Sequence, residues 1–223
     1  MTSFDVRVIE EKLSAGMAEL GLASDSADRA RLCVYLQLLA QWNKTYNLTA
    51  IDKPVDMVAR HLLDSLSIAP HLYGQRILDV GTGAGLPGVP LAIQFPQREF
   101  HLLDSNGKKM RFLFQVKHTL GLHNVILHQS RAEKFREPRG FDCIVSRALA
   151  SLQQFVSSSA HLLAPGGCFL AMKGGVDASE LAGLAKPYNI AARIRLEVPG
   201  IGTPRQLLRI ERDPTFVHHM APV

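Results

Sequence analysis

Apolar residues recur at three- and four-residue steps through the first part of the chain. In the stretch RARLCVYLQLLAQW, residues 29–42, they mark one face, with Tyr35 beside it. This period predicts an amphipathic helix, and Trp42 is expected to anchor that helix in the core. The same period predicts a second helix over residues 55–69. Residues 1–70 are therefore expected to form a helical extension packed on the rest of the protein.

From residue 76 the pattern changes to short apolar runs that alternate with helical ones. Strands are predicted at 76–80, 99–104, 124–129, 141–147, 166–174, 189–198 and 205–213, and helices at 91–95, 108–120 and 152–163. Strands that alternate with helices predict an α/β fold with a mostly parallel sheet. The last two strands have no helix between them, which predicts an antiparallel edge. We expect this domain over residues 71–213 and a poorly ordered tail over 214–223.

Composition and charge narrow the class of protein without deciding its function. The chain has 223 residues, of which 47% are hydrophobic, and a net charge of +5. This mild basic excess is compatible with an RNA partner but does not require one. The three cysteines form no CxxC pair and are expected to be buried thiols in a reducing cytosol. No segment approaches the roughly 18 apolar residues of a membrane span, so we expect a cytoplasmic protein with no membrane and no metal.

The glycine-rich stretch RILDVGTGAGLPGVP, residues 76–90, follows the first predicted strand and is typical of a nucleotide-type ligand loop. Asp79 precedes Gly81 and Gly83, and an acid before such a loop fits a ligand with positive charge, as S-adenosylmethionine has. Asp104 ends the second strand, where it can accept hydrogen bonds from ribose hydroxyls. A GxGxxG fingerprint for a dinucleotide is present only in a shifted register. A phosphate loop of the GxxxxGK[ST] type is absent.

Several sequence blocks resemble those of one known family. QWNKTYNLTAI, RHLLDSL, DVGTGAGLPGVPLAI, LLDSNGKKMRFL, FDCIVSRALASL and MKG occur in that order over residues 35–175. The chain thereby resembles the bacterial 16S ribosomal RNA guanine-N7 methyltransferases, a family called RsmG or GidB. The resemblance implies a class I methyltransferase fold that binds S-adenosylmethionine and methylates N7 of guanine-527 in the 530 loop of 16S rRNA. It also implies cofactor contacts from Gly81, Leu86, Ala132, Glu133 and Arg147, to which the loop pattern adds Gly83 and Asp104.

The chemistry of guanine N7 agrees with the residues present. N7 offers an in-plane lone pair, so no proton has to leave before an in-line methyl transfer and no general base is required. Arg147, at the carboxyl end of a strand, could hold the cofactor or contact O6 beside N7. Lys173 ends the next strand and is expected in the same cleft, although a structural salt bridge is nearly as good an interpretation. Arg147, Lys173 and His61 are the candidate catalytic residues. We expect His61 to support the substrate site, with Asn43, Asn47 and Asp64 folding over the same cleft.

Other reactions and other functions receive less support. The position after the fourth strand lacks the Pro-Pro-aromatic motif of enzymes that methylate exocyclic amines, and Cys143 lies mid-strand rather than in an exposed nucleophile loop. A nicotinamide-dependent oxidoreductase would rest on the shifted fingerprint alone, with no YxxxK pair. A non-enzymatic ribosome assembly factor is the third hypothesis.

Two groups of basic residues are candidates for contacts to RNA phosphate. They are Lys108, Lys109 and Arg111 after the second strand, and Arg131, Lys134, Arg136 and Arg139 after the third. Both groups are expected near the ligand-binding edge of the sheet, although a solvated helix face is an equally good interpretation of the first. The expected partner is 16S rRNA, within the 30S subunit or its precursor. The expected oligomeric state is a monomer.

Overall fold

The computed structural model describes residues 4–23, 25–147 and 151–213. The tail predicted at 214–223 lies outside the described residues. Within those ranges, no helix has the length and apolar character needed to cross a membrane.

Seven strands form one sheet. They are β1 (Arg76–Val80), β2 (Glu99–Asp104), β3 (Val125–Gln129), β4 (Phe141–Arg147), β5 (Leu163–Lys173), β6 (Tyr188–Arg195) and β7 (Gln206–Arg212). Their order across the sheet is β3-β2-β1-β4-β5-β7-β6. The first five strands run parallel, whereas β7 is antiparallel to both β5 and β6. This arrangement confirms the predicted α/β fold with an antiparallel edge.

Helices cover both faces of the sheet, which is why the parallel strands are near-continuous apolar runs. The helices on one face are α5 (Gly88–Gln94) and α6 (Gly107–Leu120), and those on the other are α7 (Leu152–Ser159) and α8 (Ala178–Ala182). The cores on the two faces are separate clusters. Cys143 and Cys168 are buried within the sheet and Cys33 beneath the N-terminal helices, and all three thiols are free, as the sequence predicts.

The N-terminal residues form helices that share a core with the sheet. These are α1 (Val6–Glu19), α2 (Ser26–Tyr46), α3 (Pro54–Met57) and α4 (Asp64–Leu66), with a π-helical turn, η1 (Val58–Leu63), before α4. Tyr35 of α2 is fully buried. The ring of Trp42 is half-buried, 5.6 Å from the ring of Phe112 in α6, so Trp42 packs on the core as predicted.

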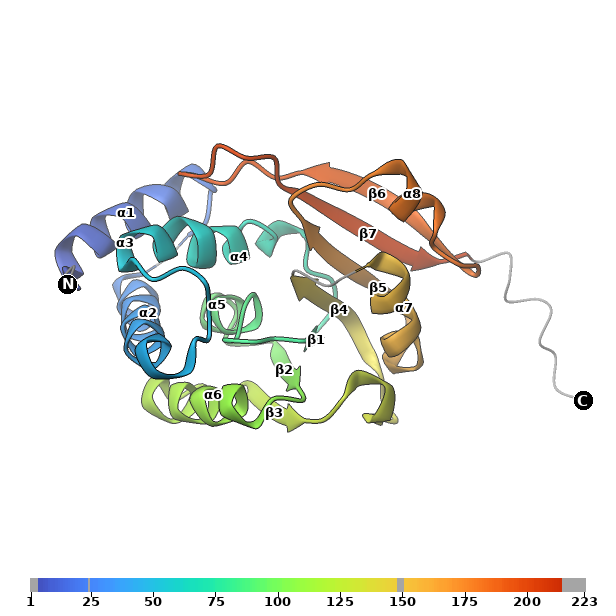
Figure 1. The fold of residues 1–223 in the computed structure, drawn as a ribbon, viewed down its shortest axis with the longest axis horizontal. Coiled ribbons are helices and arrows are strands. Elements are labelled where there is room, and N and C mark those ends of the chain that lie inside the picture. Colours follow the sequence, from blue (N-terminus) through green and yellow to red (C-terminus); the bar gives the residue numbers. More distant parts are fainter. Residues whose placement is uncertain (1–3, 24, 148–150, 214–223) are drawn as a thin grey trace, which may run out of the picture.

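The segment predicted as one helix over 55–69 is interrupted by the π turn. The Asp64 N–H reaches back to the carbonyl of Ala59, five residues earlier, which widens the turn. At this point α1 approaches closely, because Gly16 has no Cβ to meet the side chain of Leu63. Figure 1 shows α4 between α1 and α5. A hydrophobic period of 3.6 residues cannot indicate such a local widening, because tertiary packing decides it.

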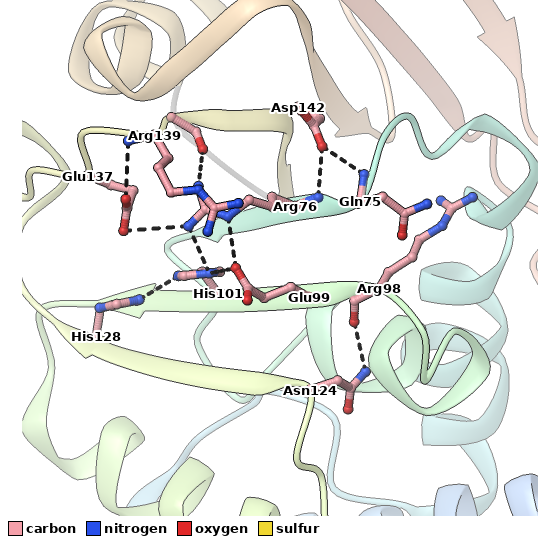
Figure 2. A network of polar contacts seen from close by, with 11 residues as sticks. Gln75, Arg76, Arg98, Glu99, His101, Asn124, His128, Glu137, Arg139 and Asp142 are labelled. Carbon is pink, nitrogen blue, oxygen red and sulfur yellow. Dashed lines mark hydrogen bonds and ion pairs between the residues drawn. The ribbon is translucent and has the colours of Figure 1, made fainter.

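A polar cluster joins β1, β2 and β3 and includes the amino ends of the first two strands (Figure 2). Arg76 Nε donates to Glu99 Oε1 at 2.8 Å, and His101 Nε2 lies 2.7 Å from the same oxygen. These hydrogen bonds, with that from His101 the stronger, lower the pKa of Glu99 to about 2. His101 Nδ1 in turn lies 2.8 Å from Nε2 of His128. The cluster thus connects the side chains of three neighbouring strands.

Candidate active site

The glycine loop begins where β1 ends. The φ angles of three loop glycines are positive: 68° at Gly81, 61° at Gly83 and 93° at Gly85. Residues with a Cβ rarely adopt this backbone conformation. Further on, the Gly88 N–H donates to Asp79 Oδ2 at 2.8 Å, and an added Cβ there would overlap the side chain of Leu102. Gly88 is therefore the glycine that lets α5 pack tightly on the sheet.

Asp79 is a buried carboxylate beneath this loop. Its Oδ2 accepts hydrogen bonds from the Thr82 hydroxyl at 2.7 Å and from the Gly88 N–H. Burial raises the pKa of Asp79 to about 6, against the lowering effect of those two hydrogen bonds. Its Oδ1 is also buried and has no hydrogen-bond partner among the described residues. An acceptor left in this state is suited to a donor or a cation from a ligand.

A cavity of about 270 Å³ lies at the carboxyl ends of β1, β2 and β3. Its lining is Val80, Gly81, Leu103, Asp104, Ser105, Ser130, Arg131, Ala132, Glu133, Gln154 and Ser158. Four of the predicted cofactor residues, Gly81, Asp104, Ala132 and Glu133, thus come together in one place. Leu86, by contrast, is 4% exposed and belongs to the hydrophobic core under the loop.

Asp104 connects the loop to this cavity. Its Oδ2 accepts the Gly83 N–H at 3.0 Å and lies 3.4 Å from Lys109 Nζ, and its Oδ1 accepts the Asn106 N–H at 2.9 Å. Gly83, predicted as a cofactor residue, thus touches the carboxylate expected to hold a ribose. Lys109, a candidate for phosphate contact, is paired with Asp104.

A second cavity, of about 290 Å³, lies at the carboxyl ends of β4 and β5 beside the N-terminal segment. Its lining is Ile51, Arg60, His61, Asp64, Arg147, Met172, Lys173, Gly174, Leu196, Arg205 and Gln206. The three predicted catalytic residues, His61, Arg147 and Lys173, all belong to it. Because β1 and β4 are neighbours, the two cavities lie beside each other along one edge of the sheet.

Asp64 stands between two arginines in the second cavity. Arg147 Nη1 lies 3.3 Å from Asp64 Oδ2 and also donates to the Arg60 carbonyl at 3.0 Å. Arg205 Nε donates to Asp64 Oδ1 at 3.0 Å. The carboxylate is 5% exposed, so it can fix the direction of both guanidinium groups. Asp64 folds over the cleft as the sequence predicts.

His61 is held on both ring nitrogens. Nδ1 lies 3.0 Å from the Arg60 carbonyl, which can only accept, so Nδ1 carries the proton. Nε2 then accepts from the Thr49 hydroxyl at 2.8 Å. Burial, helped by the charge of Arg147, lowers the pKa of His61 to about 4. His61 is therefore a neutral group that positions the chain.

The remaining predicted residues take supporting positions. The Asn43 side chain accepts the Thr49 N–H at 2.8 Å and thereby holds the connector that carries Thr49. Asn47 ends α2 with a φ of 49°. Lys173 Nζ lies 2.7 Å from Glu180 Oε1 of α8. Within the described ranges, no three His, Cys, Asp or Glu side chains are grouped as a metal site requires.

Comparison with known proteins decides the family of this chain. Residues 28–208 match the family described as rRNA small subunit methyltransferase G. The chain belongs to that family. It is 53% identical over 203 residues to the ribosomal RNA small subunit methyltransferase G of Chromohalobacter salexigens, covering 91% of this chain and 97% of the relative. The protein of the same name from Pseudomonas paraeruginosa is 51% identical over 203 residues, covering 91% and 95%.

Solved structures support the fold of this family member. A methyltransferase from Aquifex aeolicus described as SAM-dependent matches with a TM-score of 0.54 at 17% identity, covering 74% of this chain and 96% of that one. A ribosomal protein L11 methylase from Lactobacillus delbrueckii matches with a TM-score of 0.51 at 19% identity, covering 67% and 76%. The predicted class I methyltransferase fold is confirmed. As a family member the chain is a methyltransferase, which removes the oxidoreductase and the non-enzymatic binder from consideration.

Sequence reasoning missed two residues of this methyltransferase site. The strand pattern over 205–213 gives Arg205 no role in the site, although Arg205 shares Asp64 with Arg147. The Tyr35 hydroxyl donates to the Ala84 carbonyl of the glycine loop at 2.8 Å. Tyr35 lies beside the apolar face of its helix and carries a polar hydroxyl, which is a weak signal for a buried hydrogen bond.

Proposed function

We propose that this methyltransferase transfers a methyl group from S-adenosylmethionine to N7 of guanine-527 in 16S rRNA, within the 30S subunit or its precursor. The observation that carries the proposal is the pair of neighbouring cavities at one sheet edge. One is lined by Gly81, where the glycine loop begins, and by Asp104, an acid suited to a ribose, and the other is lined by Arg147 and Lys173. The small subunit rRNA comes from the family description, and guanine-527 from the resemblance of the sequence blocks.

The residues of the first cavity fit S-adenosylmethionine. Asp104 can exchange its internal hydrogen bonds for ribose hydroxyls. Asp79 lies outside the lining, buried beneath the loop, where its carboxylate with the unpartnered Oδ1 favours a cationic group nearby. Ala132 and Glu133, which line the same cavity, remain for the adenine. The cofactor supplies a methyl group bonded to a sulfonium sulfur, and the neutral thioether is the leaving group.

The second cavity would receive the guanine. Arg147 presents a planar guanidinium that can donate to O6, the acceptor beside N7. Asp64 and the Arg60 carbonyl restrict its rotation, so the arginine can orient the base. Lys173, at the end of the adjacent strand, lines the same cavity and is held in place by its ion pair with Glu180. His61 keeps η1 and the connector around Thr49 in place.

The proposed reaction needs no general base. The N7 lone pair attacks without losing a proton, so catalysis can rest on positioning. His61, the group in the second cavity with a pKa shifted by burial, has both nitrogens occupied within the protein. In this step the N7–methyl bond forms as the methyl–sulfur bond breaks, and the positive charge passes from the sulfonium to the guanine ring. We therefore propose that Arg147 and Lys173 act by orienting the base, and that the chain takes up no proton from the substrate.

The test is methyl transfer from labelled S-adenosylmethionine to 16S rRNA and to 30S subunits, both from cells lacking this protein. We expect label as 7-methylguanosine in the 530 loop. Arg147→Ala should abolish transfer while the protein still folds, and Arg7→Ala, at an exposed position of α1, is the matched control. Absence of label on both substrates, with cofactor binding measured by calorimetry, would refute the substrate. Failure to bind the cofactor would refute the whole proposal.

A further inference from the structure

A basic groove lies on the antiparallel edge of the sheet, in addition to the two cavities described above. It is a groove of about 370 Å³ lined by Arg193, Arg195, Pro204, Arg205 and Gln206, called here the hairpin groove. β6 carries the first two arginines on its outer face, since its residues alternate between half-buried and exposed and both arginines fall on the exposed positions. No acidic side chain is among the described residues of its lining. The groove therefore favours an anion.

The hairpin groove is continuous with the second cavity. Arg205 and Gln206 line both. In the sheet register, Gln206 pairs with Lys173 on one side and with Arg195 on the other. Paired residues of neighbouring antiparallel strands lie on the same face, about 5 Å apart. A row of polar and basic side chains thus leads from the second cavity to the edge of the sheet.

The loop between the hairpin strands is fixed against the N-terminal helices. Leu196 and Val198 are buried in the core that those helices share with the sheet. Gly200 approaches Ala59 of η1, where an added Cβ would lie 3.1 Å from the Ala59 Cβ. The red segment beyond β6 in Figure 1 runs toward α1. The arginines of the hairpin groove are therefore held at a constant distance from the second cavity.

The guanidinium groups of this groove remain accessible to a ligand. Arg193 uses Nε to donate to Gln206 Oε1 at 2.7 Å, which leaves its terminal nitrogens as donors. Arg195 pairs with Glu197 at 2.7 Å, but the two side chains are 84% and 81% exposed. An ion pair so exposed contributes little and exchanges readily for another anion.

Two of the basic residues that the sequence indicated have internal partners. Lys109 is paired with Asp104. Arg136 Nη1 donates to the carbonyls of Glu133 and Phe135 at 2.7 and 2.8 Å. These internal contacts anchor the cofactor side of the site, whereas the hairpin groove lies on the side of the proposed guanine cavity.

We propose that the hairpin groove binds the phosphate backbone of the RNA strand that flanks the target nucleotide. The inference rests on the proposed function, because it takes RNA as the substrate. Guanidinium groups bind phosphate oxygens with paired hydrogen bonds. With the backbone held by Arg193 and Arg195, the neighbouring base reaches the second cavity along the row that ends at Lys173. The groove contributes affinity for RNA and no base specificity.

The test is an Arg193→Gln/Arg195→Gln double variant, with Arg7→Gln/Arg31→Gln as a control that loses the same charge from exposed positions on α1 and α2. Binding of a 530-loop RNA fragment is measured as a function of salt, and KM and kcat as methyl transfer. For two phosphate contacts to single-stranded RNA, we expect the salt slope to fall by about 1.4. KM should rise roughly tenfold, with kcat and the cofactor Kd unchanged.

Several results would overturn the inference. An unchanged KM and salt slope in the double variant would do so, as would an equal loss in the control, since that would indicate a general effect of net charge. A defect on 30S subunits without a defect on the RNA fragment would assign the groove to a ribosomal protein instead. The proposed function fails in a different way, because the wild-type protein would then transfer no methyl group to either substrate.

Discussion

The substitution Tyr35→Phe tests whether the N-terminal extension positions the glycine loop. The Tyr35 hydroxyl, on α2, donates to the Ala84 carbonyl at 2.8 Å. The side chain is fully buried, and burial raises the pKa of Tyr35 above its usual range, so the hydroxyl stays a donor at neutral pH. Ala84 follows Gly83, whose N–H binds Asp104. The hydrogen bond thus connects the first helices of the chain to the proposed cofactor site.

The expected magnitude follows from the burial of both partners. Phenylalanine has the same shape apart from the hydroxyl, so the packing of the ring is retained. The Ala84 carbonyl, in a residue that is 4% exposed, loses its donor, which costs about 1–3 kcal/mol. For a protein of this size, each 1 kcal/mol lowers Tm by about 2–4 °C. If 1 kcal/mol of this free energy is lost from holding the loop in the conformation that binds S-adenosylmethionine, the Kd for that cofactor rises about fivefold.

Thermal unfolding and calorimetric titration with S-adenosylmethionine measure the two effects. Tyr46→Phe is the matched control, because Tyr46 ends the same helix and is 41% exposed. A Tm for Tyr35→Phe within one degree of the control would refute the reasoning. A lower Tm with an unchanged Kd would mean that the loop is positioned by its own backbone hydrogen bonds.

Three further predictions follow from the site. Gly88→Ala should cost about 1–3 kcal/mol, measured by calorimetry, because its Cβ would overlap Leu102, whereas Gly202→Ala, with nothing within 4 Å, should leave stability unchanged. Since the pKa of His61 is lowered from 6.5 to about 4, the unfolded chain binds that proton first, so the free energy of unfolding should fall as pH drops through this window. His61→Gln should flatten that fall in urea titrations at pH 4.5 and 7. Asp64→Asn should release its two arginines and abolish methyl transfer while cofactor affinity persists, and an active variant would contradict the assignment.

Much of the first cavity could be predicted from the sequence because its parts are local. Gly81 follows directly on an apolar strand, and its positive φ is a property of the loop itself. Asp104 ends the next strand, and the carboxyl ends of parallel strands meet at one edge of the sheet. The glycine loop after one strand, the acid at the end of the next and the topology of parallel strands were therefore sufficient to predict that Gly81 and Asp104 meet. The alternation of strands and helices determined the sheet in the same way.

The second cavity depends on contacts that no local pattern encodes. Asp64 lies 83 residues from Arg147 and 141 residues from Arg205 in the chain. The periodicity of the N-terminal segment predicted which residues face inward, but not which partner they meet there. The π turn of η1, the hydrogen bond from Tyr35 to the loop and the arginines of the hairpin groove have the same origin. Each requires the packed arrangement of helices and edge strands. Side chains that are far apart in the sequence take fixed positions relative to one another only when the hydrophobic core between their elements has formed.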